Sequence, residues 1–470
     1  MVRRRSARVS VLAGALLVAP LLVSCTLVFE SGGDPPVPVN PPPEVVLDLS
    51  LSNERALDLL LVVDDSGSML EKQRLLGQGF DQLLASLVGP GEGPVDLHVG
   101  VVSSSMGTFG VDLGGITCRN DRGALLGADR CGVTGTYLRE TADGNRNFPG
   151  TMAEAVSCLT DLGAGGCGFE QHLAAMHAAL RNDNGGSSTF LRPWAKLAVV
   201  ILADEDDCSA RGPEFFGPAS AELGSLDSFR CFEFGVECDG PADPRVPGPR
   251  TNCRPSNDTT YLLGVDGYVD YLTSLKADRA DVMVAVITGA DQPVQVTVTP
   301  PPGGGPLRPD LVPSCQYQGL SNTETADPAV RLTAFADRLA MATAQEGRAP
   351  RGVTTSVCSN DLGPALAEIG AAAHDLFGDP CLRAALADTN PNLPGLQAGC
   401  AVEVVTSPGS PFQISTVIEP CNELAPSLCY RIAPDLARCA GTPDALALTV
   451  EQQVGPLPPG VRVHARCQIE

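Results

Sequence analysis

Residues 57–69 read LDLLLVVDDSGSM, and this stretch decides the fold of the chain. Its apolar run, Leu59–Val63, is typical of a strand buried on both faces, as in the parallel sheet of an α/β domain. The run ends at oxygen-bearing side chains in alternate positions, Asp64, Ser66 and Ser68. Ligands of such sheets bind outside the carboxyl ends of the strands. A set of oxygen donors suits Mg²⁺ best here, or Mn²⁺ or Ca²⁺, and suits Zn²⁺ poorly.

The order Asp64-x-Ser66-x-Ser68 after an apolar strand resembles the first element of the metal-ion-dependent adhesion site (MIDAS) in von Willebrand factor type A (VWA) domains. A second apolar run, Leu197–Leu202, also ends in acidic residues. In the resembled family an aspartate after the fourth strand completes the metal site, and Asp204 occupies that position. The alternative is a solvated acidic loop, which is what a run of charges usually forms. Two such strand ends in the right chain order favour the metal site.

The middle element of the resembled site departs from the family pattern. Type A domains place a threonine in a glycine-rich loop before a helix, and here Cys167 stands at that point. A disulfide-bonded cysteine cannot ligate Mg²⁺. Glu170 and Thr151 are the candidate substitutes, and Glu205 and Asp206 are candidates for further metal or ligand contacts.

The first residues predict export. A basic segment with four arginines precedes the apolar run Val11–Val23, which is too short for a spanning helix and is typical of a signal peptide over residues 1–24. The sequence Leu22-Val-Ser-Cys25 resembles a bacterial lipobox, which implies lipid attachment to the Cys25 thiol. Thr26 follows, with no aspartate to indicate inner-membrane retention, so we expect an anchor in the outer membrane of a Gram-negative bacterium. An ordinary secreted protein is the alternative.

Charge and cysteine content narrow the class of protein. With 32 basic and 55 acidic residues the net charge is −23, which argues against nucleic acid and anionic lipid as partners. Of 17 cysteines, 16 remain without Cys25, so an exported chain is expected to form up to eight disulfides. No C-x-x-C pair supports a zinc ribbon or a redox site. The sequence leaves the pairing open, although short spacings make local loops plausible at Cys118/Cys131, Cys158/Cys167 and Cys231/Cys238.

The order of elements predicts a doubly wound, mostly parallel sheet of the VWA or Rossmann-like kind over residues 51–380. Residues 25–50 are expected to be a Pro/Gly-rich tether, and residues 381–470 a small Cys-rich β domain. Insertions are expected at about 106–150, 209–260 and 291–328. We expect helices at 70–87, 152–162, 268–275, 330–344 and 362–377, and a further helix that ends at 180. We expect strands at 59–63, 95–102, 197–202, 282–287, 352–357, 401–405, 412–417, 445–450 and 461–467.

Three classes of function remain. The layout resembles VWA-domain lipoproteins of Gram-negative bacteria, which implies a non-enzymatic adhesion module that binds a divalent cation and, through it, a carboxylate of an unidentified partner protein. An enzyme is the rival, but the serines lack a G-x-S-x-G context and the five histidines form no metal-binding motif. The third class is a structural envelope protein with a vestigial metal site, which the cysteine at position 167 favours.

Overall fold

The computed structural model describes most of the chain, and residues 43–470 form one compact unit. The described residues are 43–50, 55–90, 92–114, 118–127, 129–181, 189–300, 304–344, 350–406, 413–422, 428–452 and 461–470. The predicted signal peptide, Cys25 and the tether as far as residue 42 lie outside these ranges. Within these ranges, no helix has both the length and the apolar character needed to cross a membrane.

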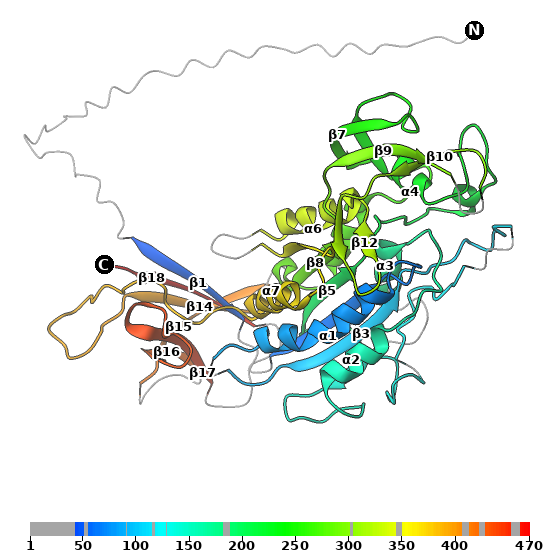
Figure 1. Cartoon of the computed structure of the whole chain (residues 1–470). Coiled ribbons are helices and arrows are strands. Elements are labelled where there is room, and N and C mark those ends of the chain that lie inside the picture. The colour runs from blue at the N-terminus through cyan, green and yellow to red at the C-terminus, as the bar shows by residue number, and fades with distance from the viewer. Residues whose placement is uncertain are drawn as a thin grey trace, which may run out of the picture. The chain divides into compact units, whose positions relative to one another are not determined.

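The central sheet has six strands in the order β13-β8-β5-β2-β3-β4 (Figure 1). Five strands run parallel, and β4 pairs antiparallel with β3 at one edge. The strands β2, β5 and β8 are buried along their whole length, as their apolar runs require. Their bounds are Ala56–Val63 (β2), Asp96–Ser103 (β3), Leu138–Glu140 (β4), Lys196–Leu202 (β5), Val282–Thr288 (β8) and Gly352–Ser356 (β13).

Helices cover both faces of this sheet because side chains alternate along each strand. On β2, Leu59 and Leu61 share a core with α1, α2 and α7, whereas Leu60 and Val62 share another core with α3, α5 and α6. The helices α1 and α7 lie against each other on the first face (Figure 1). The helices are Leu70–Ser86 (α1), Met152–Thr160 (α2), His172–Arg181 (α3), Val265–Ser274 (α5), Val330–Ala342 (α6) and Gly363–His374 (α7). The predicted helices and central strands are confirmed to within a few residues.

The second and third predicted insertions join in one structure. Each supplies two strands to a four-stranded antiparallel sheet with the order β10-β9-β7-β6. β7 and β10 are polar and contain proline, so the alternating apolar pattern that marks a strand is weak in them, whereas β9 (VQVTVT) has this pattern within a predicted insertion. The elements are Phe229–Gly235 (α4), Val236–Asp239 (β6), Gly248–Pro255 (β7), Val294–Thr299 (β9) and Arg308–Leu311 (β10), and the hairpin is Cys315–Gln318 (β11) with Thr323–Ala326 (β12).

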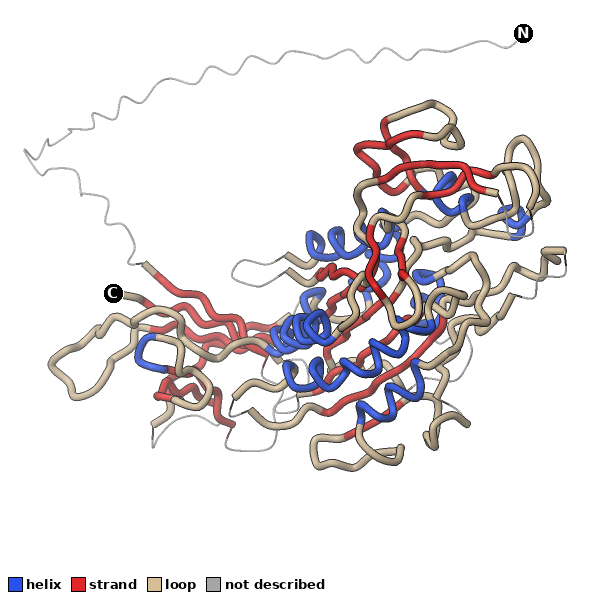
Figure 2. Tube along the Cα trace, viewed as in Figure 1, coloured by secondary structure: helices blue, strands red, loops and turns tan. Residues whose placement is uncertain are grey.

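A second six-stranded sheet contains the C-terminal residues and has the order β1-β18-β14-β15-β16-β17. Its first strand, β1, comes from Glu44–Ser50, within the predicted tether, and pairs antiparallel with β18. The end of the segment assigned to the tether is therefore part of the C-terminal sheet, whose strands are red in Figure 2. The others are Cys400–Thr406 (β14), Ile414–Pro420 (β15), Leu428–Pro434 (β16), Leu446–Gln452 (β17) and Arg462–Gln468 (β18).

Eight disulfides link the sixteen cysteines that follow Cys25, as predicted from their even number. The local pairs that the short spacings suggested are wrong, because the chain path brings together cysteines that are further apart in sequence. The bonds are Cys118–Cys167, Cys131–Cys158, Cys208–Cys231, Cys238–Cys253, Cys315–Cys358, Cys381–Cys439, Cys400–Cys467 and Cys421–Cys429.

Candidate metal centre

The loop after β2 holds Asp64 at the carboxyl edge of the sheet. The Asp64 backbone N–H donates to the carbonyl of Leu202 on the neighbouring β5, at 3.0 Å. Its carboxylate Oδ1 accepts the N–H of Ser66 at 2.8 Å, which fixes the tight turn of this loop. The hydroxyls of Ser66 and Ser68 lie 3.3 Å apart. Asp64 is fully buried, and its Oδ2 has no hydrogen-bond partner among the described residues.

Asp204 lies at the same edge, because β5 pairs with β2 in parallel register. Its side chain is 3% exposed, and Oδ2 forms an ion pair with Lys72 Nζ at 2.9 Å. Within the described residues Oδ1 has no hydrogen-bond partner. Burial and the neighbouring Asp64 raise the pKa of Asp204, and Lys72 opposes that increase.

The third loop at this edge brings Glu170 to the acidic side chains. The loop is held by the Gly166 N–H, which donates to the Asp65 carbonyl at 2.7 Å, and by the Cys208 N–H, which donates to the Glu170 carbonyl at 2.8 Å. Glu170 is 1% exposed, and neither of its carboxylate oxygens has a hydrogen-bond partner in the described part of the chain. Its pKa is raised well above the usual value by burial, by Glu205 and then by Asp64.

Cys167 does not contribute to this edge. It is bonded to Cys118, and its side chain packs in a small core with Phe169, Phe215 and Phe216. The loop therefore presents the Glu170 carboxylate, while its cysteine anchors the neighbouring insertion.

The other predicted candidates have different surroundings. Thr151 is the N-cap of α2 and exchanges hydrogen bonds with Glu154, so its hydroxyl is engaged in a capping box. Asp206 accepts the N–H groups of Arg331 and Leu332 at the start of α6. Burial raises the pKa of Asp206 to about 6, against the lowering effect of these hydrogen bonds.

Glu205 lies among other carboxyl groups. Burial, Asp327 and Asp204 raise its pKa well above the usual value. Together with Asp310 and Asp327, it lines a small cavity between the central sheet and the insertions. The four consecutive acids after β5 are thus divided between the sheet edge, this cavity and the N-termini of two helices, since Asp207 accepts the N–H of Leu173 in α3 at 2.9 Å.

Two basic residues at this edge, Lys72 and His172, were not predicted from the sequence as site residues. Lys72 is fully buried in the first turns of α1 and also contacts Glu324 of the β11–β12 hairpin, at 3.0 Å. His172 is fully buried, with Nε2 at 3.5 Å from Asp64 Oδ2. Burial lowers the pKa of His172, but Asp64 outweighs burial and the net effect is an increase. The position of His172 two residues after Glu170 is the one signal that could have indicated its role.

The edge therefore carries more buried carboxyl groups than basic groups. We refer to four neighbouring carboxyl groups as the acidic cluster: Asp64, Glu170 and Asp204 at the edge, and Glu205 in the adjoining cavity. Buried ionised groups are costly unless they are paired or coordinate a metal. Carboxylates and hydroxyls with unused lone pairs are the donors that hard divalent cations prefer. The residues at this edge therefore fit such a cation, with Asp64 Oδ2, Asp204 Oδ1 and the Glu170 oxygens as its carboxylate donors.

The acidic cluster is not a tight group of side-chain ligands. In the described ranges, the group of three or more His, Cys, Asp or Glu donors that lie within 4.8 Å of one another is Cys421, Cys429 and Glu451. Those two cysteines form a disulfide, which removes them as metal ligands. At the sheet edge, a cation would need the serine hydroxyls and water to complete its coordination, which is the mode typical of Mg²⁺.

Comparison with known proteins gives distant structural neighbours. No protein-family model and no curated protein matches the sequence. A von Willebrand factor type A protein from Catenulispora acidiphila is 11% identical with a TM-score of 0.28, over 91% of this chain and 66% of its own. The pilus adhesin SpaC from Lactobacillus rhamnosus GG is 13% identical with a TM-score of 0.31, and the match covers 91% of this chain and 41% of SpaC. The adhesive tip pilin GBS104 from Group B Streptococcus agalactiae is 11% identical with a TM-score of 0.27, and the match covers 91% of this chain and 82% of GBS104.

The chain spans less than two thirds of the length of the first two neighbours. TM-scores of this size do not define its fold or function. What the described residues define is a mixed α/β protein with a parallel sheet and eight disulfides, a content typical of proteins that fold in an oxidising compartment outside the cytoplasm.

Proposed function

We propose that this chain is a lipid-anchored adhesion module of the bacterial cell surface, with a VWA-type, doubly wound domain that binds a divalent cation. Asp64, Ser66, Ser68 and Asp204 are its proposed ligands, and Glu170 takes the place of the family's threonine. Mg²⁺ is the expected ion, with Mn²⁺ and Ca²⁺ as alternatives. The observation that carries the proposal is the set of buried carboxylate oxygens at the sheet edge that have no hydrogen-bond partner in the described ranges.

The partner is proposed to bind through the cation. A cation held by two hydroxyls and a few carboxylates keeps exchangeable water, and a carboxylate of another protein replaces that water. The membrane attachment is proposed to be a lipid on Cys25, and we place the protein on the outer membrane of a Gram-negative bacterium. Replacing Cys25 by serine should then abolish incorporation of labelled palmitate and release the protein from membranes.

The cation is tested by calorimetric titration of oxidised residues 43–470 with MgCl₂, MnCl₂ and CaCl₂. We expect binding at one site that Asp64→Asn abolishes. Asp81→Asn is the matched control, since Asp81 is an exposed carboxylate on α1 and its replacement changes the net charge equally. Absence of binding by the folded wild-type protein would reject the cation site and favour the alternative, a structural envelope protein with a vestigial site.

The carboxylate partner is tested with Mn²⁺ as a paramagnetic reporter. Acetate should reduce the water-proton relaxivity of the Mn²⁺-loaded protein because it displaces exchangeable water, and uncharged acetamide should not. Equal effects of acetate and acetamide would contradict carboxylate binding while leaving cation binding intact.

A further inference from the structure

A groove on the α3 side of the sheet has a composition unlike the rest of this acidic chain. It has a volume of about 800 Å³ and lies between the loop after β3, the helices α3 and α5, and the segment after β5. Its charged side chains are two arginines, it also contains a histidine and two aromatic rings, and no described aspartate or glutamate takes part. We call it the basic groove because of its arginines. The lining residues that matter for the argument are Phe109, Arg122, Gln171, His177, Arg211 and Tyr268.

The charge of the basic groove indicates an anionic ligand. Arg122 and Arg211 both line it, in a protein whose net charge is −23. The Arg211 guanidinium is positioned by a hydrogen bond from Nε to the Thr259 carbonyl. Local positive charge in a strongly negative molecule attracts anions and opposes the general repulsion.

Tyr268 supplies an aromatic surface. Its side chain is 4% exposed and its hydroxyl is buried beside Asp207 and Ser209, so the ring is the part that lines the groove. The Tyr268 ring stands edge-on to His177 at 5.9 Å, so both side chains belong to the same wall.

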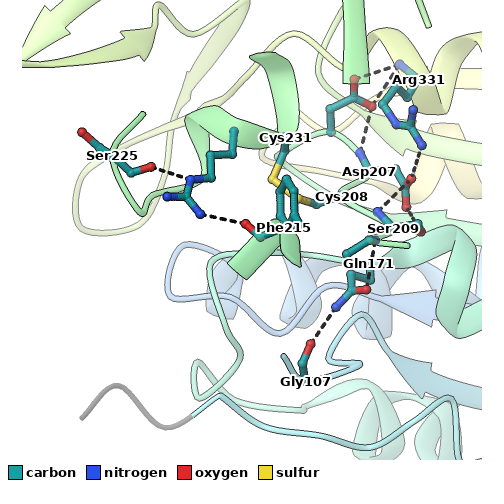
Figure 3. Close-up of a disulfide and its surroundings, with 12 residues drawn as sticks. Gly107, Gln171, Asp207, Cys208, Ser209, Phe215, Ser225, Cys231 and Arg331 are labelled. Carbon is teal, nitrogen blue, oxygen red and sulfur yellow. Dashed lines mark hydrogen bonds and ion pairs between the residues drawn. A yellow bond between two sulfur atoms is a disulfide. The ribbon is translucent and has the colours of Figure 1, made fainter. Parts of the chain in front are cut away.

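Hydrogen bonds of Gln171 hold the floor of the groove together. The Gln171 amide donates to the Gly107 carbonyl at 2.8 Å and accepts the Ala210 N–H at 3.2 Å, so it joins the loop after β3 to the segment after β5 (Figure 3). Phe109 lies at the rim of the groove, and 56% of this residue is exposed to solvent. Both Phe109 and Arg122 have a φ of 54°, in the left-handed region that side-chain-bearing residues seldom adopt. Such strained residues concentrate at ligand sites.

A protein ligand fits this lining better than a small molecule. Aromatic residues, methionine and arginine are enriched in the cores of protein interfaces, and the groove combines Met106, Phe109 and Tyr268 with its two arginines. An exposed phenylalanine at a rim is available for an apolar side chain of a partner.

We propose that the basic groove binds an acidic segment of a partner protein, with an aspartate or glutamate carboxylate at the arginines and a neighbouring apolar side chain against Phe109. The site is separate from the candidate metal centre, since its lining includes none of the proposed cation ligands. Binding in the groove therefore does not require a cation.

The probe is an acetylated and amidated peptide, Gly-Phe-Glu-Phe-Glu-Gly, titrated calorimetrically into oxidised residues 43–470 in EDTA. We expect binding that weakens as NaCl is added and that falls at least about tenfold in Arg122→Glu and in Arg211→Glu, since each loses a charge-assisted hydrogen bond. Arg139→Glu is the matched control, because Arg139 is exposed on β4 and outside the groove. A peptide with glutamine in place of glutamate should bind at least about tenfold more weakly.

Circular dichroism of each variant separates loss of binding from loss of fold. No binding of the peptide to the wild-type protein would overturn the proposal. It would also be overturned by equal losses in Arg122→Glu and Arg139→Glu, or by binding that needs Mg²⁺ and disappears in Asp64→Asn. Because the titration is carried out in EDTA, failure of the cation site leaves its expected result unchanged.

Discussion

Lys72 Nζ lies 2.9 Å from Asp204 Oδ2, and both side chains are buried at the end of the central strands. The lysine neutralises one face of a carboxylate whose other oxygen is unpartnered within the described residues. This protein therefore supplies part of the positive charge at the sheet edge itself. Because burial of Lys72 is outweighed by Asp204 and Glu324, its pKa is raised and it stays charged at neutral pH.

Replacing Lys72 by methionine should make the protein depend on a divalent cation. Removing one partner of a buried ion pair costs about 3–5 kcal/mol, so the free energy of unfolding should fall by that order in EDTA. Mg²⁺ should restore part of the loss, because the unneutralised carboxylates attract it more strongly. The increase in melting temperature on adding MgCl₂ should therefore be larger in Lys72→Met than in the wild type.

Lys276→Met is the control for this prediction. Lys276 is also buried, pairs with Asp58 at 3.5 Å and lies at the opposite end of the sheet strands. Its loss should destabilise the protein without changing the response to MgCl₂. Equal responses of the two variants would contradict a special role of Lys72 at the cation site.

Gly166→Ala should disrupt the loop that carries Glu170. A Cβ on Gly166 would lie 2.6 Å from the Asp65 carbonyl oxygen, where the loop docks on the end of β2. We expect a loss of about 1–3 kcal/mol in stability from this overpacking, together with weaker Mg²⁺ binding. Gly168→Ala, two residues on, meets no atom within 4 Å and should leave both quantities nearly unchanged. Thermal melts and calorimetric titration of the two variants, side by side, test the docking directly.

The parts of the site that could be predicted were those marked by a short stretch of sequence, an apolar run directly followed by polar residues. The apolar runs before Asp64 and Asp204 define adjacent strands with polar ends, so parallel pairing brings the two residues to one edge. Lys72 was not predicted because its partner Glu324 lies 252 residues away, on a hairpin within the segment that the sequence predicted only as an insertion at about 291–328. His172 was not predicted because an isolated histidine on a helix is usually a core or surface residue.

The errors in the fold have similar causes. Short cysteine spacings suggested local disulfides, but pairing follows the path of the folded loops, which brings Cys118 to Cys167 across 49 residues. β1 was assigned to the tether because prolines precede it, although its partner strand is the C-terminal β18. The pairing of two strands so far apart in sequence leaves little trace in the local pattern of either strand.

Asp281 joins the two large sheets electrostatically, and it predicts a pH dependence. It precedes β8, contacts Lys196 of β5 at 2.7 Å and accepts a hydrogen bond from Arg462 of β18. Burial alone would raise the pKa of Asp281, but Lys196 and Arg462 outweigh burial and lower it to about 2, from an ordinary value of 3.8. The ionised form is thus favoured in the folded protein relative to the unfolded chain.

The stabilisation from Asp281 should be complete above pH 4 and disappear as the pH falls towards 2, because a depressed folded-state pKa favours folding only while the unfolded carboxyl is ionised. The shift corresponds to about 2 kcal/mol at pH 7. Asp281→Asn should therefore lower the free energy of unfolding by at least that order at pH 7. The difference from the wild type should narrow as both proteins approach pH 2, where Asp281 becomes neutral.

Urea unfolding at pH 7, 5, 3 and 2 measures this difference, in which the other titrating groups largely cancel. Glu451→Gln is the control, because Glu451 forms an exposed ion pair with Arg431 at 2.7 Å and exposed pairs contribute little. Its difference from the wild type should be small at every pH. A loss in Asp281→Asn that stays constant from pH 7 to pH 2 would show that Asp281 acts through packing or hydrogen bonding and not through its charge.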